Sequence, residues 1–157
     1  MLNPCAAMTD DLTIRAARPE DARLLWEWRN APDVRAVSLD SKPIPFEQHR
    51  EWYERSLANP DRVILIVEYE MTPAAMVRFD HDKGIATVSI ILASEIRGKG
   101  MAKRILASTI DEVLPRPQAL RAFIKPENAP SLALFHGVGF EIVQDGDPLV
   151  LEMTMPE

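Results

Sequence analysis

The sequence predicts a mixed α/β domain, with a central sheet of about seven strands flanked by four helices. Short apolar runs rich in β-branched residues recur along the chain, and segments of helical periodicity separate them in the order β-α-α-β-β-β-α-β-α-β-β. This order suits a layered structure with helices on both faces of the sheet. The length of 157 residues suits a single domain over residues 12–155, and we expect a flexible segment over residues 1–11.

The first strand is expected over Leu12–Ala16, where apolar and polar residues alternate. A proline suits the first position of a helix over residues 19–30, because the N–H that proline lacks is unpaired there in any residue. Trp26 and Trp28 fall on different faces of this helix, so one is expected to pack in the core and the other to line a groove, and the alternative is that both only pack. Three prolines and no clear period predict a loop over residues 31–45.

A second helix is expected over Phe46–Ala58, with His49 and Trp52 adjacent on one face. Residues 80–84 combine turn formers with Gly84 and predict a hairpin turn. The other elements follow from apolar runs, helical spacing and proline breaks. The expected strands are 63–69, 75–79, Ile85–Leu92, Ala119–Ile124, 140–143 and 149–155, and the expected helices are 101–114 and 128–138.

Composition argues against several classes of protein. The 24 acidic and 18 basic side chains give a net charge of -6, whereas a nucleic-acid partner needs a broad basic face. No apolar run approaches the roughly 20 residues of a membrane span, and residues 1–11 lack a signal-peptide layout, so we expect no membrane partner and a cytoplasmic location. The three histidines lie far apart in the sequence, so no metal site is expected, and a single cysteine forms no internal disulfide.

The loop after the strand Ile85–Leu92 carries the clearest ligand signal. Gly98 and Gly100 remove Cβ atoms where a ligand could approach the backbone, and Arg97 and Lys99 add positive charge. The free N–H groups of the following helix would face this loop, and phosphate is the usual occupant of such a site. The pattern lacks the Ser or Thr of a P-loop and the third glycine of a Rossmann turn. The alternative is a glycine-rich turn without a ligand.

Two motifs together resemble one superfamily. The hexapeptide from Arg97 to Ala102 has the form Arg/Gln-x-x-Gly-x-Gly/Ala and is similar to the pyrophosphate loop of the GCN5-related N-acetyltransferases, the GNAT superfamily. The segment that begins at Asn128 has the form Asn-x-x-Ser-x-x-Leu-Tyr/Phe-x-x-x-Gly-Phe and resembles a later segment of the same superfamily. The order of elements also looks like the GNAT fold from Leu12 to Met155, which implies a mixed, mostly antiparallel sheet.

The resemblance implies acetyl-coenzyme A as acetyl donor, a small-molecule amine as acceptor, no metal, and a homodimer. The strand before the loop would pair main-chain groups with the pantetheine arm, at an edge that a bulge splays open. The residues that the resemblance assigns to coenzyme binding are Ile90, Ile91, Leu92, Arg97, Gly98, Lys99, Gly100, Met101, Ala102, Asn128, Ser131 and Phe135.

Phe135 departs from the many relatives that carry a tyrosine there, which protonates the leaving thiolate. General acid–base help is worth about 10²–10⁴-fold, so its loss need not abolish the reaction. We expect direct attack of a neutral amine on the thioester carbonyl in a ternary complex, with backbone N–H groups near Leu92 stabilising the oxyanion. The candidates for the base that assists the amine are His49, Glu68, Glu70 and Asp80, and the sequence does not choose among them.

Short stretches around Arg29, His49 and Arg78 resemble acetyltransferases that act on nucleotide-linked amino sugars in pseudaminic- and legionaminic-type pathways. Under this reading the acceptor pocket is formed by Trp26, Arg29, His49, Trp52 and Arg78, which offer rings to a base or sugar and cations to a diphosphate. One alternative is acetylation of a protein N-terminus or lysine, as in ribosomal-protein acetyltransferases. A second is a GNAT protein that binds acyl-coenzyme A without catalysis.

Overall fold

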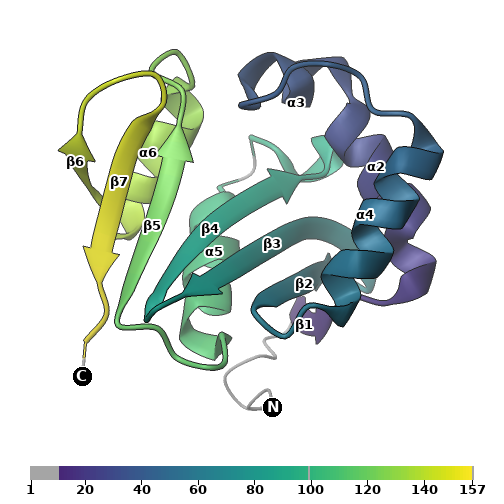
Figure 1. Cartoon of the computed structure of the whole chain (residues 1–157), viewed down its shortest axis with the longest axis horizontal. Helices are drawn as coiled ribbons and strands as arrows, with labels where there is room; N and C mark the ends of the chain where they lie inside the picture. The colour runs from purple at the N-terminus through teal and green to yellow at the C-terminus, as the bar shows by residue number, and fades with distance from the viewer. Residues whose placement is uncertain (1–10, 99, 157) are drawn as a thin grey trace.

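The computed structural model describes residues 11–98 and 100–156 (Figure 1). The described residues form a seven-stranded sheet in the order β1-β2-β3-β4-β5-β7-β6, in which β4 and β5 are the one parallel pair. The strands are β1 (Leu12–Ala16), β2 (Arg62–Tyr69), β3 (Thr72–Asp82), β4 (Ile85–Leu92), β5 (Ala119–Ile124), β6 (Glu141–Gln144) and β7 (Leu149–Thr154). The predicted mixed, mostly antiparallel class is confirmed.

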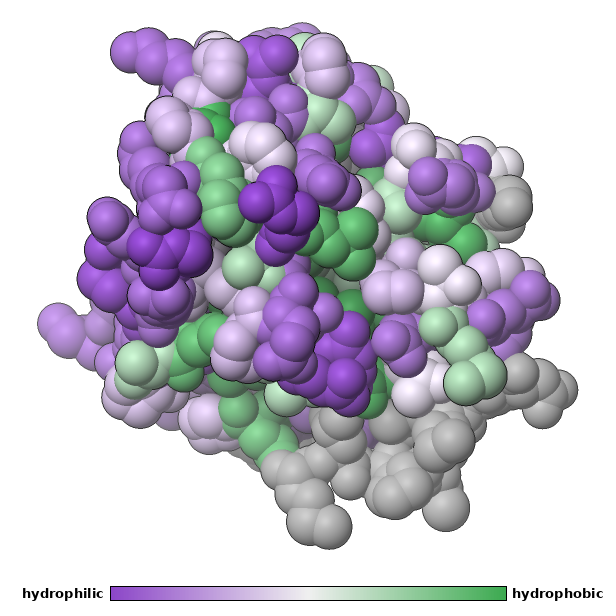
Figure 2. All heavy atoms as spheres, turned by 90° about the vertical axis from the view of Figure 1, so that its right-hand side faces the viewer, coloured by the Kyte–Doolittle hydropathy of each residue, from purple (hydrophilic) through white to green (hydrophobic). Residues whose placement is uncertain are grey.

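Helices cover both faces of this sheet. They are α2 (Ala22–Asn30), α3 (Pro32–Val37), α4 (Phe46–Ala58), α5 (Ala102–Glu112) and α6 (Ala129–Val138), with 3-10 turns η1 (Pro19–Asp21) and η2 (Ser94–Ile96). Strand β2 is buried on both sides: Ile66 packs with Leu25 and Tyr53 beneath α2 and α4, whereas Val67 faces the core that holds Leu106 of α5 (Figure 1). The outward face of α2 and α4 is largely hydrophilic (Figure 2).

The largest differences from the prediction lie in residues 31–45 and at the end of β3. The expected loop over residues 31–45 contains helix α3, which starts at Pro32 with Asp33 in its first turn. Strand β3 extends through Asp82 because it pairs with β4 from Ala75 to Asp82, so the turn shrinks to Lys83 and Gly84, both at positive φ. The described part of the chain therefore contains five α-helices rather than four.

The region before β1 is described only from Asp11 onward. The Asp11 carbonyl accepts a 2.8 Å hydrogen bond from the Glu70 N–H, and the Asp11 carboxylate forms an ion pair with Arg104. Asp11 is therefore bonded to the rest of the domain, and the other ten residues of the segment expected to be flexible lie outside the described structure. In the residues that the structure describes, no helix has the length and apolarity to cross a bilayer.

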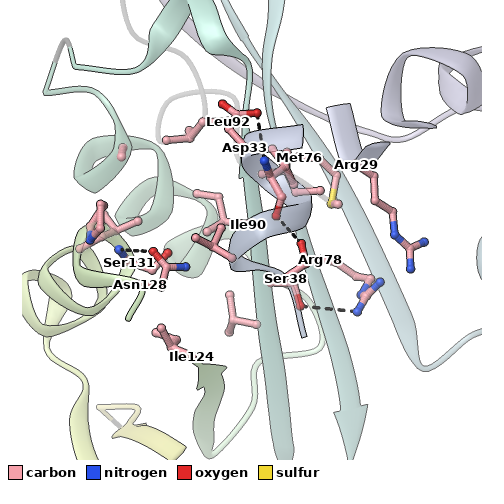
Figure 3. Close-up of a pocket in the computed structure, with 18 of the residues that line it drawn as sticks. Arg29, Asp33, Ser38, Met76, Arg78, Ile90, Leu92, Ile124, Asn128 and Ser131 are labelled. Carbon is pink, nitrogen blue, oxygen red and sulfur yellow. Dashed lines mark hydrogen bonds between the residues drawn. The ribbon is translucent and has the colours of Figure 1, made fainter. Parts of the chain in front are cut away.

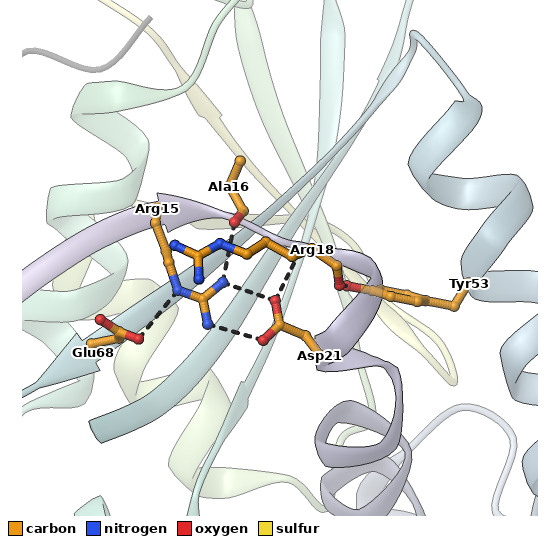
Figure 4. Close-up of polar contacts among 6 residues, drawn as sticks. All are labelled: Arg15, Ala16, Arg18, Asp21, Tyr53 and Glu68. Carbon is orange, nitrogen blue, oxygen red and sulfur yellow. Dashed lines mark hydrogen bonds and ion pairs between the residues drawn. The ribbon is translucent and has the colours of Figure 1, made fainter. Parts of the chain in front are cut away.

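Polar contacts anchor α2 and α4 at the edge of the sheet (Figure 4). Arg15 of β1 forms two hydrogen bonds of 2.8 and 2.9 Å with Asp21, and a third of 3.2 Å with Glu68. The buried Tyr53 hydroxyl donates a 2.6 Å hydrogen bond to the Arg18 carbonyl. These contacts tie the start of α2 to β1 and to α4, and so hold the two helices in place against the sheet.

Strands β4 and β5 diverge, and this opening positions the site. They pair only from Ile85 to Thr87 on β4, and beyond that point β5 turns away (Figure 1). The Ala93 N–H donates a hydrogen bond to the Ala74 carbonyl on β3. Main-chain groups alternate in direction along an antiparallel strand, so those of Ile90 and Leu92 point away from β3 and toward the opening. The predicted bulge is absent from the β3–β4 register, and divergence of the parallel pair opens the edge instead.

Candidate active site

A cavity of about 1020 Å³ begins at this opening and runs beneath α2, α3 and α4. Figure 3 shows Asn128 and Ser131 on one side of it and Arg29 and Arg78 on the other, with the end of β4 between them. We call the part bordered by residues 90–92, 96–98 and 100–102 and by α6 the glycine-loop end, and the part bordered by His49, Trp52 and the two arginines the arginine end. One continuous cavity thus joins the two groups of residues singled out in the sequence.

The glycine-loop end contains the residues predicted to bind the coenzyme. Gly98 and Gly100 have φ angles of +73° and +71°, and a Cβ at either position would meet no atom within 4 Å. Among residues 11–98 and 100–156, no side chain caps the start of α5 at Met101, so its first N–H groups are left for a ligand. Lys99 lies outside the described residues. The predicted residues that line the cavity are Ile90, Ile91, Leu92, Arg97, Gly98, Gly100, Met101, Ala102, Asn128, Ser131 and Phe135.

Arg97 is held between the loop and α3. Its guanidinium donates hydrogen bonds of 3.0 and 3.3 Å to the Leu92 carbonyl and forms an ion pair with Asp33. The hydrogen bond from Arg97 lowers the pKa of the Asp33 carboxyl. Arg97 therefore links the predicted diphosphate loop to a helix that the sequence analysis missed. A proline followed by an acid at residues 32–33 was the available signal, although six residues are too few to show a helical period.

Helix α6 borders the other side of the glycine-loop end. The Asn128 side-chain oxygen accepts a 3.3 Å hydrogen bond from the Ser131 N–H and so caps the helix. Phe135 is buried and packs edge-on against Phe140, with ring centroids 5.0 Å apart. Asn128 therefore shapes the helix start as well as lining the cavity, and Phe135 offers no proton there.

The arginine end is built around the Trp52 ring. The guanidinium carbons of Arg29, Arg62 and Arg78 lie 4.8, 5.4 and 5.4 Å from the ring centroid. Arg62 and Arg78 share one carboxylate, since each donates to an oxygen of Asp80, at 2.5 and 3.1 Å. Arg62, which no sequence motif singles out, lies behind the cavity rather than on its wall. The site is therefore strongly basic.

His49 is the predicted base that lines the cavity. The residue is 1% exposed, both ring nitrogens are buried, and neither makes a hydrogen bond of normal geometry to a described residue, although the Ala22 main chain lies close enough to oppose the lowering of the pKa. The imidazole stacks on Tyr53 at 5.9 Å and lies 5.7 Å from the Trp52 ring centroid. Burial lowers the pKa of His49, and the positive charge of Arg29 lowers it further, so the imidazole is neutral at pH 7. The other candidates, Glu68, Glu70 and Asp80, do not line the cavity.

Trp26, predicted to face the acceptor, does not line the cavity. Its Nε1–H donates a 2.7 Å hydrogen bond to the Ile44 carbonyl, and its ring packs edge-on against Phe46 at 5.4 Å. The Ile44 N–H in turn donates to the Asn30 side chain at 2.8 Å. Trp26 therefore fastens the segment after α3, whose residues Ser38, Leu39, Asp40, Lys42 and Ile44 form part of the cavity wall.

Comparison with known proteins defines the class to which this arrangement belongs. Residues 11–141 match the family described as the acetyltransferase (GNAT) domain. The chain is also 30% identical over 139 residues to YwnH of Bacillus subtilis strain 168, which is provisionally assigned as a phosphinothricin acetyltransferase. That match covers 82% of this chain and 83% of YwnH. The chain belongs to the GNAT acetyltransferase family and is an acetyl-coenzyme A-dependent N-acetyltransferase.

Solved structures share this fold at low sequence identity. Spermidine N-acetyltransferase from Vibrio cholerae, in complex with coenzyme A and spermine, has a TM-score of 0.81 and 19% identity, and the match covers 93% of this chain and 96% of that one. Aminoglycoside acetyltransferase AAC(6')-Ib, in complex with coenzyme A, has a TM-score of 0.76 and 17% identity, with 91% and 94% covered. These likenesses establish the fold, and the choice of acceptor depends on this chain's own residues.

The residues at the glycine-loop end fit an acetyl-coenzyme A molecule. Uncapped N–H groups at the start of α5 and the open space beside Gly98 and Gly100 suit a diphosphate. The main-chain groups of Ile90 and the Leu92 N–H face the gap left by β5 and suit a pantetheine arm and its thioester, whereas the Leu92 carbonyl is bonded to Arg97. When bound, this donor supplies an acetyl thioester. Among the described residues, no group of three or more His, Cys, Asp or Glu could hold a metal ion.

Proposed function

We propose that this enzyme transfers an acetyl group to the primary amine of a nucleotide-linked amino sugar. The observation that carries the proposal is the single cavity that leads from the glycine-loop end to an aromatic ring edged by arginines. A nucleotide base or sugar ring suits the face of Trp52, and the amine then lies toward the end of β4. The short motifs around Arg29, His49 and Arg78 support the same acceptor, and those three residues all line the cavity.

In the proposed reaction the amine nitrogen attacks the thioester carbonyl while His49 takes its proton. A C–N bond forms and the C–S bond breaks, and the leaving group departs as a thiolate. His49 suits this role because its imidazole is neutral and borders the cavity, and its buried ring nitrogens make no hydrogen bond of normal geometry to a described residue. The Leu92 N–H, which points into the opening, would stabilise the oxyanion. Phe135 leaves thiolate protonation to water, which a thiol of ordinary acidity, with a pKa of about 8.5, permits.

The test is an acceptor screen that follows release of free coenzyme A from acetyl-coenzyme A. The panel contains a UDP-linked deoxy-amino sugar, a peptide with a free N-terminus, and a peptide with an internal lysine. The proposal expects turnover of the nucleotide-linked sugar, whereas preferred turnover of either peptide would favour the ribosomal-protein type of activity. We expect His49→Gln to lower kcat about 10²-fold, the lower end of general-base effects. The matched control is His136→Gln, because His136 is exposed and does not line this cavity.

A second candidate acceptor is a small amino acid that carries a phosphinate, such as phosphinothricin. The 30% identity to YwnH favours it, and so do the arginines beside Trp52. The same screen includes phosphinothricin as a fourth acceptor. Preferred acetylation of phosphinothricin over the UDP-linked sugar would replace the first candidate with the second.

A further inference from the structure

Arg29 is the guanidinium at the arginine end that lacks a partner. It lines the cavity from the last turn of α2, and its Cζ lies 4.8 Å from the Trp52 ring centroid. The structure gives it no hydrogen bond or ion pair to any described residue, and Figure 3 shows its guanidinium without a contact among the residues drawn. Arg78 differs, because it donates to Asp80 at 3.1 Å. Five N–H donors of Arg29 therefore remain available in the cavity.

The charges around Arg29 do not balance. Three guanidiniums surround Trp52, and the carboxylate that contacts them is that of Asp80, already shared by Arg62 and Arg78. Burial lowers the pKa of Arg29, as does the like charge of Arg78, while Asp40 opposes the shift. Asp40 itself is exposed and accepts a hydrogen bond from the Lys42 N–H. A partly buried cation without a paired anion is unfavourable, so an anionic ligand would complete the site.

We propose that Arg29 is the specificity-determining residue of this enzyme, and that it binds an oxyanion of the acceptor while Trp52 contacts the adjoining part of the molecule. The inference rests on the proposed acetyltransfer, and it names the property by which acceptors are selected. A phosphate, phosphinate or carboxylate can each accept two parallel hydrogen bonds from one guanidinium. Amines that carry such a group are acetylated, and amines that carry only positive charge are rejected. The spermine seen in the Vibrio cholerae enzyme belongs to the rejected class.

The arrangement explains why charge, rather than shape alone, selects the acceptor. A second ammonium group placed near Trp52 would meet Arg29 and Arg78 as like charges in a partly desolvated pocket. A negatively charged group at the same place gains charge-assisted hydrogen bonds from Arg29, which gives up no existing partner to make them. Loss of charge-assisted bonds of this kind corresponds to about 10- to 100-fold in affinity.

The experiment compares two acceptors that differ in the UDP group, which carries the anionic diphosphate. Wild type, Arg29→Met and Arg29→Lys are assayed with a UDP-linked amino sugar and with the same amino sugar lacking UDP, and spermidine is the cationic acceptor. Methionine keeps an apolar stem over Trp52 without the charge. The matched control is Arg23→Met, since Arg23 is exposed on the same helix and stacks on Phe46 at 4.2 Å, outside the cavity. Coenzyme A affinity is measured for every variant.

We expect wild type and Arg23→Met to prefer the UDP-linked sugar by about 100-fold in kcat/KM, the upper range for charge-assisted hydrogen bonds. Arg29→Met lowers this preference by at least about 10-fold, with coenzyme A affinity unchanged. Arg29→Lys has an intermediate preference, because lysine keeps the charge but lacks the two parallel N–H donors of a guanidinium. Equal turnover of the sugar without UDP, or of spermidine, would overturn the inference while leaving acetyltransfer intact. So would an Arg29→Met enzyme that keeps the wild-type preference.

A binding measurement separates failure of the inference from failure of the proposed function. UDP is titrated into the protein by calorimetry with coenzyme A at saturation, so that the glycine-loop end is already filled. Saturable UDP binding that Arg29→Met weakens and Arg23→Met does not would support the anion site, even if no amine in the panel is acetylated. Absence of UDP binding together with active acetylation of uncharged amino sugars would refute it.

Discussion

Replacing Asp33 by asparagine should tighten the binding of coenzyme A. In the structure the Arg97 guanidinium contacts both the Leu92 carbonyl and the Asp33 carboxylate. The same guanidinium is the predicted contact for the diphosphate. The ligand must therefore compete with Asp33 for this cation. At the start of α3 the Val34 N–H donates a 2.9 Å hydrogen bond to the Asp33 side chain. Asparagine removes the charge but keeps a side-chain oxygen that can accept this hydrogen bond.

The size of the effect follows from the exposure of the pair. The side chains of Arg97 and Asp33 are 35% and 60% exposed, so the ion pair is screened by solvent and worth about 0.2–1 kcal/mol. If the whole of this is returned to the ligand, affinity rises by about 1.4- to 5-fold. The gain should shrink as salt is raised from 0.05 to 0.5 M, because the Debye length falls from about 14 Å to about 4 Å.

Isothermal calorimetry with coenzyme A measures the change directly, with Glu47→Gln as the control. Glu47 is an exposed acid paired to Arg50 on α4 and does not border the cavity, so its removal changes the net charge equally without touching the site. Affinity that stays the same or weakens in Asp33→Asn, with the fold intact and Glu47→Gln unchanged, would refute the competition between Asp33 and the diphosphate.

Three further changes test other parts of the structure. Gly100→Ala places a side chain at φ +71°, so we expect about 1–2 kcal/mol lower stability and weaker coenzyme A binding, measured by urea unfolding and calorimetry. Tyr53→Phe removes the 2.6 Å hydrogen bond to the Arg18 carbonyl and should lower the free energy of unfolding by about 1 kcal/mol, with the KM for acetyl-coenzyme A unchanged. The lowered pKa of His49 means that the unfolded chain binds a proton near pH 6.5 that the folded chain does not, so stability falls on acidification below that pH. Urea unfolding at pH 7 and pH 5 should show a smaller loss for His49→Gln.

Each of these predictions has a control or an outcome that would contradict it. Gly137→Ala is the match for Gly100→Ala, because Gly137 lies within α6 without positive φ and a Cβ there meets only ordinary contacts. A Tyr53→Phe protein as stable as wild type would show that the hydroxyl bond adds nothing net. If wild type and His49→Gln lose equal stability between pH 7 and pH 5, a group other than His49 causes the loss of stability at acidic pH.

The spacing of apolar residues predicted those strands and helices well in which buried positions repeat with the period of the element. The alternation in Leu12–Ala16 and the β-branched, apolar run of Ile85–Leu92 predicted β1 and β4 with the observed bounds, because a period of two and a β-branched composition are both visible in the side chains. The six-residue helix α3 was missed because it buries no residue and leaves no periodic trace. The end of β3 was misplaced because its pairing with β4, rather than its composition, carries the strand through Asp82.

The sequence by itself determined the superfamily, the sheet class and the loop from Arg97 to Ala102, since these depend on residue types at short, fixed spacing. Tertiary structure alone decided which distant side chains share the cavity. It placed His49 on the wall and left Glu68 and Asp80 off it, turned Trp26 away, and joined Arg97 to Asp33. The reason is physical: periodicity indicates the face of an element on which a side chain lies, but where that face is directed depends on packing between elements far apart in the chain.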